Sequence, residues 1–502
     1  MTTLERTTPT QRHNVSARAS ALERVRETGE LRQIEDRVAR RRAAQARMTA
    51  PGSGFGRTDA GNGEYFARLY GDRVRFDHRR GCWLVWADHW WRADDTRQVR
   101  RLAKEAARAR YQGAAAIGDL RDRAEEARFA IATENRGRID AMLVGAQSEP
   151  PVADAGDRWD GDPWLLGVGN GVLDLRTGIL RSGSPTDRIT LHTDVAYTRD
   201  ATCPRWERFL DEVFARDDEL VDYIARAVGY SLTGQTSEQC VFLGHGSGAN
   251  GKSVFLATLR ALGGDYATNT PFSTFELKAR ASIPNDLAAL AGRRLVTASE
   301  TNEGARLNEG RLKALTGGDA VTARFLGREF FTFEPTAKFW LAVNHKPTVS
   351  DDSYGFWRRV RLIPFTRQFT GDADPMLSET LRRELPGILA WAVRGVLAWK
   401  DRGLAPPVSV RAATDTYRAE SDPLGDFLAA RCVELEGTEV GATAVYHAYR
   451  VWATAEGLDR EMLTATTFGR RMKERFGSVH RKTGNAYLGV GLLLSDPSGG
   501  GR

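Results

Sequence analysis

A glycine-rich segment between two apolar runs constrains the fold of this chain more than any other feature. Residues Gly246-Ser247-Gly248-Ala249-Asn250-Gly251-Lys252-Ser253 fit the pattern G-x-x-x-x-G-K-[ST]. The apolar run 241–244 before it predicts a strand, and the amphipathic run 254–262 after it predicts a helix. Glycines let such a loop wrap around phosphates with its N–H groups pointing inward, and the helix N-terminus adds its dipole. The sequence therefore predicts the strand–loop–helix unit of an α/β domain that binds a nucleoside triphosphate.

The last two residues of the motif have predicted chemical roles. The ammonium of Lys252 is expected to neutralise the β- and γ-phosphates, and the hydroxyl of Ser253 to coordinate Mg²⁺. The backbone of residues 246–251 is expected to line the phosphates. The predicted cofactors are ATP and Mg²⁺.

A second metal-binding or water-orienting group is predicted downstream of the loop. The apolar run Leu295–Ser299 reads as a strand and ends in the carboxylate of Glu300. ATPases need such an acid at the end of a neighbouring strand to hold Mg²⁺ or orient water. We expect Glu300 to fill this role, and Glu303 is the alternative.

Two further polar groups follow predicted strands. Phe339–Val343 reads as a buried strand with Asn344 at its end, where an amide can position the attacking water against the γ-phosphate. Arg358 and Arg359 precede the apolar residues around Ile363, and they are candidates for an arginine finger that enters the site of a neighbouring subunit. The alternative for these arginines is a surface salt-bridge face.

Residues 320–334 predict a hairpin with a basic tip. Two β-like runs, 320–325 and 330–334, flank the turn Gly327-Arg328-Glu329. Arg328 lies at the predicted tip.

These features together resemble a known family. The loop, the strand ending in an acid, the segment Lys313-x-x-x-Gly317-Gly318-Asp319, the hairpin, the strand followed by Asn344 and Trp357-Arg358-Arg359 come in the order and spacing of superfamily 3 helicases. The variant is similar to the phage, plasmid and poxvirus primase-helicase family. Segments 170–175, 203–206 and 229–234 resemble the domain that precedes the ATPase in that family. The resemblance covers residues 150–370 well, and extends to about residue 490 more weakly.

The resemblance implies a hexameric ring ATPase of AAA+-like topology that encircles DNA and moves along it. It implies that Lys313 belongs to a family-specific motif and that Arg328 grips the DNA backbone in the channel. We expect both Lys313 and Arg328 to contact DNA. Many family members carry paired acids at the second strand, whereas this chain has Ser299-Glu300. The choice between Glu300 and Glu303 as the group that activates water therefore stays open.

The C-terminal region predicts a DNA-binding unit. Thr464–Phe476 reads as a helix, and a basic turn followed by the strand 486–492 comes after it. A helix followed by a basic hairpin is the layout of a winged helix, in which the helix enters a groove and the wing contacts the backbone. The alternative is a solvated basic face. The candidate DNA-binding residues here are Arg470, Arg471, Lys473, Arg481 and Lys482.

The expected organisation has seven parts. They are a basic, disordered tail (1–56), an aromatic-rich accessory region (57–147), a family-specific collar domain (148–235), the P-loop ATPase and helicase core (236–370), a helical extension and linker (371–405), a winged-helix-like domain (406–494) and a disordered tail (495–502). The predicted fold class is α/β: a P-loop, AAA+-like superfamily 3 helicase core with an α+β N-terminal and collar region and a C-terminal winged helix.

Composition limits the partners and the compartment. The net charge of +7 permits a polyanionic partner. Of 72 basic residues only nine are lysine, so each lysine is informative in a chain where arginine is the common cation. The four cysteines lie far apart, and no apolar run approaches the ~20 residues that a membrane helix needs. We expect a cytoplasmic protein of a phage-infected, prophage-bearing or plasmid-bearing bacterium.

The sequence thus predicts an ATP-dependent DNA helicase of a phage, prophage or plasmid replication system, with DNA and other copies of itself as partners. Residues 1–150 offer no paired aspartates on a strand of the kind that polymerase-type primases use. We therefore expect primers to come from a separate primase or polymerase. One alternative is an ATP-switched initiator or loader that binds DNA without unwinding it, and another is a P-loop small-molecule kinase. The predicted hairpin and the motif that contains Lys313 argue against the kinase.

Overall fold

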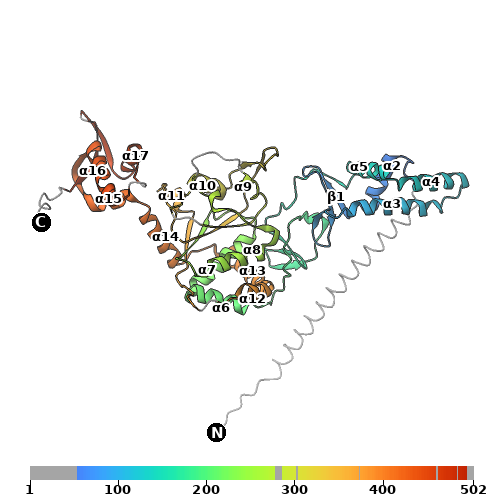
Figure 1. Cartoon of the computed structure of the whole chain (residues 1–502), viewed down its shortest axis with the longest axis horizontal. Helices are drawn as coiled ribbons and strands as arrows, with labels where there is room; N and C mark the ends of the chain where they lie inside the picture. Colours follow the sequence, from blue (N-terminus) through green and yellow to red (C-terminus); the bar gives the residue numbers. More distant parts are fainter. Residues whose placement is uncertain are drawn as a thin grey trace, which may run out of the picture. The chain divides into compact units, whose positions relative to one another are not determined.

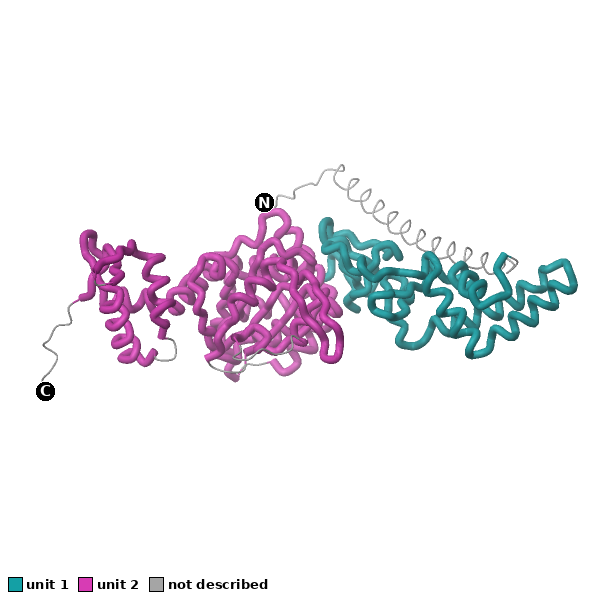
Figure 2. The backbone as a smooth tube through the Cα atoms, turned by 90° about the horizontal axis from the view of Figure 1, so that it is seen from above, with its two compact units in different colours: residues 1–201 teal, residues 202–502 magenta. Residues whose placement is uncertain are grey.

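The chain forms two compact units, residues 1–201 and 202–502, which Figure 2 distinguishes by colour. The computed structural model describes residues 54–277, 285–300, 304–371, 374–458, 462–482 and 484–493. The tail expected at 495–502 lies outside the described residues, as does nearly all of the tail expected at 1–56. The boundary between the units falls inside the range 148–235, so the predicted collar segment is divided between them.

The N-terminal unit combines a helical layer with two small sheets. Its elements are α2 (Asp59–Tyr70), β1 (Val74–Asp77), β2 (Cys82–Trp86), β3 (Trp91–Ala93), α3 (Gln98–Ala114), α4 (Leu120–Thr133), α5 (Arg136–Ala146), β4 (Ala153–Asp154), β5 (Leu165–Val168), β6 (Gly171–Asp174) and β7 (Ile179–Arg181). One sheet has the order β3–β2–β1–β4, and the other is the antiparallel set β5–β6–β7. The tryptophan-containing strands β2 and β3 pair antiparallel.

A buried polar network holds the helices of this unit together. Arg110 of α3 is 1% exposed, forms an ion pair with Glu126 of α4 and donates a 3.0 Å hydrogen bond to Asn62 Oδ1 of α2. A buried guanidinium is tolerated because its N–H groups have partners. This network joins α2 to the consecutive helices α3 and α4.

The second unit begins with two helices and is built around a parallel sheet. Its elements up to the last strand of that sheet are α6 (Pro204–Val213), α7 (Asp218–Leu232), β8 (Val241–His245), α8 (Lys252–Gly263), β9 (Ala267–Asn269), α9 (Asn285–Ala288), β10 (Leu295–Ser299), α10 (Glu309–Gly317), β11 (Val321–Ala323), β12 (Phe331–Phe333), β13 (Lys338–Val343), α11 (Tyr354–Trp357) and β14 (Val360–Pro364). Five strands form the central sheet in the order β14–β8–β13–β10–β9, and every neighbouring pair is parallel. The chain is a mixed α/β protein with a parallel sheet.

Alternate residues of the central strands face opposite helical layers. Leu243 packs in a core cluster with Leu312 of α10 and Phe356 of α11. On the other face Phe242 stacks on Trp340, and Phe255 of α8 packs against Trp340. Figure 1 shows α8 on one side of the sheet and α10 on the other. Because both faces are covered, the strands read as continuous apolar runs in the sequence.

Segments before and after the core pack against each other. Helix α7 precedes the sheet, whereas α12 (Leu377–Arg383) and α13 (Leu385–Arg402) follow it. A Cβ atom at Gly395 of α13 would lie 1.9 Å from the Ala225 carbonyl oxygen, and one at Gly229 of α7 would lie 2.3 Å from the Val396 nitrogen. These two glycines permit the close contact between α7 and α13.

The C-terminal part follows a connecting helix, α14 (Val408–Glu420). Its elements are α15 (Pro423–Arg431), β15 (Cys432–Gly441), α16 (Ala442–Ala455), α17 (Ala465–Arg475), β16 (Gly477–Arg481) and β17 (Gly484–Leu492). The three strands form an antiparallel sheet in the order β15–β17–β16. A helix followed by an antiparallel hairpin is present at the predicted position.

Candidate functional site

The glycine-rich loop lies between the end of β8 and the start of α8. Gly248, Ala249 and Gly251 adopt positive φ angles of 99°, 48° and 84°. A Cβ atom at Gly251 would lie 2.8 Å from Val213 Cγ2 of α6, so the position requires glycine for its backbone and for its space. The local sequence therefore produces the sharp strand-to-helix turn that was predicted.

Lys252, the first residue of α8, is buried with only 6% of its surface exposed. Its ammonium donates to the Gly246 carbonyl oxygen at 2.6 Å and to Asn250 Oδ1 at 2.9 Å. Burial lowers the pKa of Lys252 to about 8. Both partners are neutral oxygens, so this buried cation is suited to receive an anion.

A segment after β14 contacts the loop from one side. Gln368 Nε2 donates to Ser247 Oγ at 2.7 Å, and the Phe369 N–H donates to the Ala249 carbonyl oxygen at 2.7 Å. Asn250 Nδ2 donates to the Phe365 carbonyl oxygen at 3.3 Å. These contacts fix the loop conformation, and the sequence pattern did not indicate Gln368 as part of the site.

The carboxyl ends of three neighbouring strands meet at the loop. β13 pairs with β8 through Val343 and His245, and with β10 through Ala342 and Ser299. Glu300 and Asn344 follow directly, so the structure brings both to the same sheet edge as the loop. Asn344 is exposed.

Glu300 is 8% exposed, and both of its carboxylate oxygens are buried without a hydrogen-bond partner. Burial raises its pKa. The backbone N–H groups of His345 and Asn344 are near enough to oppose this shift in part, but neither donates a hydrogen bond of ordinary geometry. The alternative acid, Glu303, lies outside the described residues.

The donor set at this edge fits a hard divalent cation. Ser253 is exposed on the first turn of α8, and the oxygens of Glu300 lack partners. Mg²⁺ is bound through one or two protein oxygens plus phosphate oxygens and water. Ser253 and Glu300 are therefore the residues that would hold Mg²⁺.

Arg358 and Arg359 lie at the opposite edge of the sheet. They precede β14, and the Val241 N–H at the start of β8 donates to the Arg359 carbonyl oxygen. Arg358 is exposed, and its Nη2 donates to Gln239 Oε1 at 2.5 Å. Arg359 is half-buried and donates to Thr316 Oγ1 at 3.2 Å. The chain does not bring these arginines to its own glycine-rich loop.

The predicted hairpin is present as the antiparallel pair β11–β12. Arg328 is exposed between the two strands. Three apolar side chains at the tip, those of Phe325, Leu326 and Phe330, are exposed as well. The sequence pattern predicted the exposed basic residue at the tip but not these apolar side chains.

Lys313 of α10 has a carboxylate partner. Its ammonium lies 2.5 Å from Asp351 Oδ2 and 3.2 Å from Ser353 Oγ. These contacts hold Lys313 on the loop that follows β13, and its proposed contact with DNA would have to replace them.

The basic residues of the C-terminal helix and hairpin fall into two groups. Arg470, Lys473 and Lys482 are exposed, and Arg481 is paired at the surface with Glu439 at 2.8 Å. Arg471 is 1% exposed and contacts the Ser350 carbonyl oxygen and Asp352 Oδ2. The expectation that Arg471 faces DNA was wrong for this structure, because its guanidinium is buried against the core.

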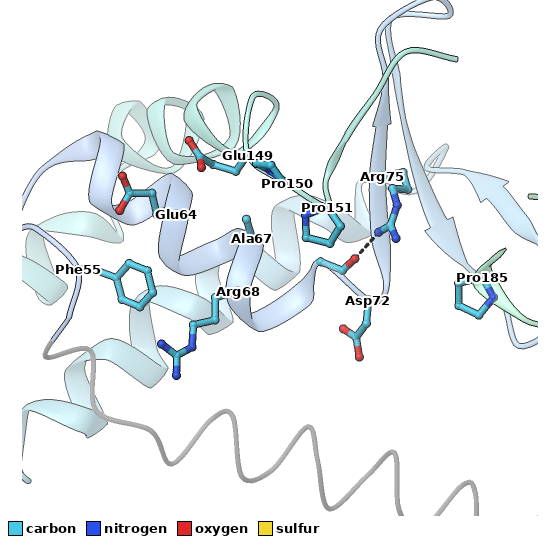
Figure 3. Close-up of a pocket in the computed structure, with 11 residues that line it drawn as sticks. Phe55, Glu64, Ala67, Arg68, Asp72, Arg75, Glu149, Pro150, Pro151 and Pro185 are labelled. Carbon is cyan, nitrogen blue, oxygen red and sulfur yellow. Dashed lines mark hydrogen bonds between the residues drawn. The ribbon is translucent and has the colours of Figure 1, made fainter. Parts of the chain in front are cut away.

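A cavity of about 700 Å³ lies elsewhere, in the N-terminal unit (Figure 3). It runs along α2 beside the turn Glu149–Pro151, and Arg75 donates to the Gly71 carbonyl oxygen at its rim. None of the predicted site residues lines this cavity. It is separate from the site at the sheet edge.

The fold and the residues at this edge define a mixed α/β protein built on a parallel sheet. Three family models match the chain: D5 N terminal like at residues 63–215, DUF5906, a family of unknown function, at residues 244–359, and Poxvirus D5 protein-like at residues 419–487. The D5-type matches on either side of the central sheet support the D5-like primase-helicase family, in its superfamily 3 helicase part. The predicted resemblance is confirmed.

Three curated relatives carry helicase or primase names. "Putative helicase L207/L206" of Acanthamoeba polyphaga mimivirus is 31% identical over 58% of this chain and 33% of the relative. "Putative helicase 022R" of Frog virus 3 is 25% identical over 60% of this chain and 40% of the relative. "Putative primase C962R" of African swine fever virus is 28% identical over 67% of this chain and 40% of the relative. The chain spans about a third to two fifths of the length of these relatives.

A solved structure, the apo NrS-1 C-terminal region, superposes with a TM-score of 0.45 at 12% identity, covering 85% of this chain and 98% of that one.

Among the described residues, no helix is long and apolar enough to span a membrane.

Proposed function

We propose that this chain is the motor of an ATP-dependent DNA helicase in a replication system. The observation that carries the proposal is that two buried charged side chains lie at the same edge of a parallel sheet. Lys252 contacts neutral oxygens, and the carboxylate of Glu300 has no hydrogen-bond partner. Triphosphate hydrolysis needs these two groups, since one stabilises phosphate charge and the other orients water or metal.

Each residue at the edge has a distinct task in this proposal. The N–H groups of residues 246–251 and the ammonium of Lys252 bind the phosphates. Ser253 and Glu300 would hold Mg²⁺, which would neutralise charge on the bound phosphates. Glu300 accepts the proton of the attacking water, and Asn344 orients that water. The raised pKa of Glu300 suits a group that must accept a proton during the reaction.

The position of the arginines supports assembly into a ring. Arg358 and Arg359 lie at the edge remote from the loop of their own chain, so a finger reaches a loop only in a neighbouring copy. Head-to-tail contacts of this kind close into rings. We expect a hexamer, as the resemblance implies.

The β11–β12 hairpin is the proposed DNA contact within the ring. Arg328 contributes a phosphate contact, and the exposed groups of the α17–β16–β17 unit, which we propose to be a winged helix, add further ones. Opening DNA costs ~1.4 kcal/mol per base-pair step, so movement must be coupled to hydrolysis.

The test is unwinding of a forked, labelled duplex with ATP and Mg²⁺. We expect the wild type to separate the strands. Lys252→Ala should lose both hydrolysis and unwinding, whereas Arg328→Ala should lose unwinding and keep basal hydrolysis. DNA-stimulated hydrolysis without strand separation would instead favour an initiator or loader. Hydrolysis that ignores DNA would contradict the proposal.

A further inference from the structure

Lys346 follows the strand next to the glycine-rich loop, and no step of the proposed function uses it. It lies two residues beyond Asn344, on the segment that leaves the carboxyl end of β13. β13 is the neighbour of β8, and the Gly246 N–H of the loop donates to the Val343 carbonyl oxygen at 3.3 Å. Lys346 therefore belongs to the sheet edge that carries Lys252 and Glu300.

The charges at this edge include Lys346. His245, the last residue of β8, has a lowered pKa because it is buried and because Lys346 and Lys252 both lie near it. Both lysines therefore add positive charge near His245, at the end of the strand that leads into the loop. A triphosphate bound by the loop would bring several negative charges to this place.

Lys346 has a carboxylate partner in the described structure. Its ammonium lies 2.5 Å from Glu420 Oε2, at the end of α14. The Lys346 side chain is 22% exposed and that of Glu420 is 52% exposed. A pair this accessible to water is weak, so a stronger anion can displace the carboxylate.

Helix α14 has other anchors that do not involve this pair. Tyr417 is buried and donates to the Pro347 carbonyl oxygen, and Thr414 Oγ1 accepts a hydrogen bond from the Leu362 N–H at 3.0 Å. Loss of the Lys346–Glu420 pair would therefore leave α14 in place. It would release only the Glu420 side chain at the end of the helix, because Arg418 in the same last turn also donates to the Asp352 carbonyl oxygen at 3.2 Å.

We propose that Lys346 is a second phosphate-binding lysine, which exchanges Glu420 for the terminal phosphate of a bound nucleoside triphosphate. The inference rests on the proposed function, since it assumes that the loop binds a triphosphate. Asn344 is the residue expected to face that phosphate, and Lys346 follows on the same segment. The exchange links the occupant of the loop to the end of α14.

The two partners have opposite predicted effects on nucleotide preference. Lys346→Gln removes a cation from the terminal phosphate, so the preference for ATP over ADP should fall about tenfold or more. Glu420→Gln removes the competitor, so the same preference should rise about two- to fivefold. A pair that served only to hold α14 would make both variants behave alike.

The experiment measures the dissociation constants of fluorescent ATP and ADP analogues with the full chain in Mg²⁺. The quantity compared is the ratio of the two constants in wild type, Lys346→Gln and Glu420→Gln. Arg411→Gln is the matched control, because Arg411 is an exposed residue of α14 that donates to the Pro406 carbonyl oxygen. Its ratio should equal that of the wild type.

Opposite shifts in the two variants would support the exchange. Unchanged ratios, or shifts in the same direction, would overturn it while leaving the proposed function intact, because ATP would still bind. A wild type that binds neither analogue would overturn the proposed function and this inference together. Lys252→Ala separates the two lysines: it should weaken both nucleotides, whereas Lys346→Gln should spare ADP.

Discussion

The two edges of the central sheet differ in the burial of their charged side chains. At the carboxyl edge Lys252 and Glu300 are buried, the first held by neutral oxygens and the second without a hydrogen-bond partner. At the amino edge Arg358 is exposed, and its side chain donates to the neutral Gln239. The carboxyl edge has the features of a binding site for a charged ligand. The amino edge exposes a cation that can contact another molecule. In the proposed ring, the amino edge of one copy would complete the carboxyl edge of the next.

The largest predicted effect tests this comparison directly. Arg358→Ala should lower ATP hydrolysis by ~10³- to 10⁵-fold, because an arginine finger stabilises charge in the transition state. Nucleotide binding should remain near that of the wild type. Arg383→Ala is the control, since Arg383 is an exposed arginine paired with Glu379 within α12. Steady-state hydrolysis and analogue binding measure the two quantities.

Mixing two inactive variants sharpens the same prediction. A Lys252→Ala subunit still carries Arg358, and an Arg358→Ala subunit still carries an intact loop. Hydrolysis should therefore reappear when the two proteins assemble together. If the mixture stays inactive while mixed assemblies form, the arginine does not act across a subunit boundary.

The second prediction concerns Glu300. Glu300→Gln should reduce hydrolysis by about 10²- to 10⁴-fold, because the amide cannot accept a proton from water. The affinity for ATP should change little, and the variant should accumulate bound ATP in a filter-binding assay. Glu303→Gln is the comparison that matters. If Glu303→Gln has the larger effect, the water-activating role moves to that residue.

The sequence predicted the carboxyl edge well because its signals are local. The loop, the strand before it and the helix after it are contiguous, and the apolar runs of β8, β10 and β13 reflect strands covered on both faces. Parallel strands place their following residues at one edge, so Glu300 and Asn344 could be assigned to it.

Side-chain contacts between segments far apart in the sequence could not be predicted from local patterns. The pairing of Lys346 with Glu420 depends on how α14 packs after the core, and Gln368 reaches the loop from beyond β14. Arg471 is buried on α17 beside Met472. Its place in the helical pattern does not reveal that the segment containing Ser350 and Asp352 covers its side chain. Side-chain partners far apart in sequence leave no periodic signal.

The third prediction is a pH dependence at Lys252. Its pKa of about 8 lies below the ordinary value for lysine, so the ammonium is charged below pH 8 and becomes neutral as pH rises above it. Affinity for ATP should be nearly constant from pH 6.5 to 7.5 and fall about fivefold between pH 8 and pH 9. Lys252→Arg should show no such fall, because a guanidinium stays protonated. A flat profile in the wild type would contradict the assignment.

The smallest predicted effect compares two adjacent arginines of α17. Arg470 is exposed and paired with Glu474 one turn along the helix, whereas Arg471 is buried against Ser350 and Asp352. Arg470→Met should weaken DNA binding about fivefold at low salt and reduce its salt dependence, because it removes a phosphate contact. Arg471→Met should leave that affinity and salt dependence unchanged in the folded protein.

Arg471→Met should instead lower the free energy of unfolding by ~1–3 kcal/mol, because removing the guanidinium leaves the carboxylate of Asp352 without its cation. Fluorescence anisotropy with a labelled duplex at several salt concentrations measures the first quantity, and urea unfolding measures the second. If Arg471→Met weakened DNA binding as Arg470→Met does, and with the same loss of salt dependence, the guanidinium would face DNA after all. The contact with Ser350 would then belong only to the DNA-free protein, and docking of α17 on the core would be a state that DNA displaces.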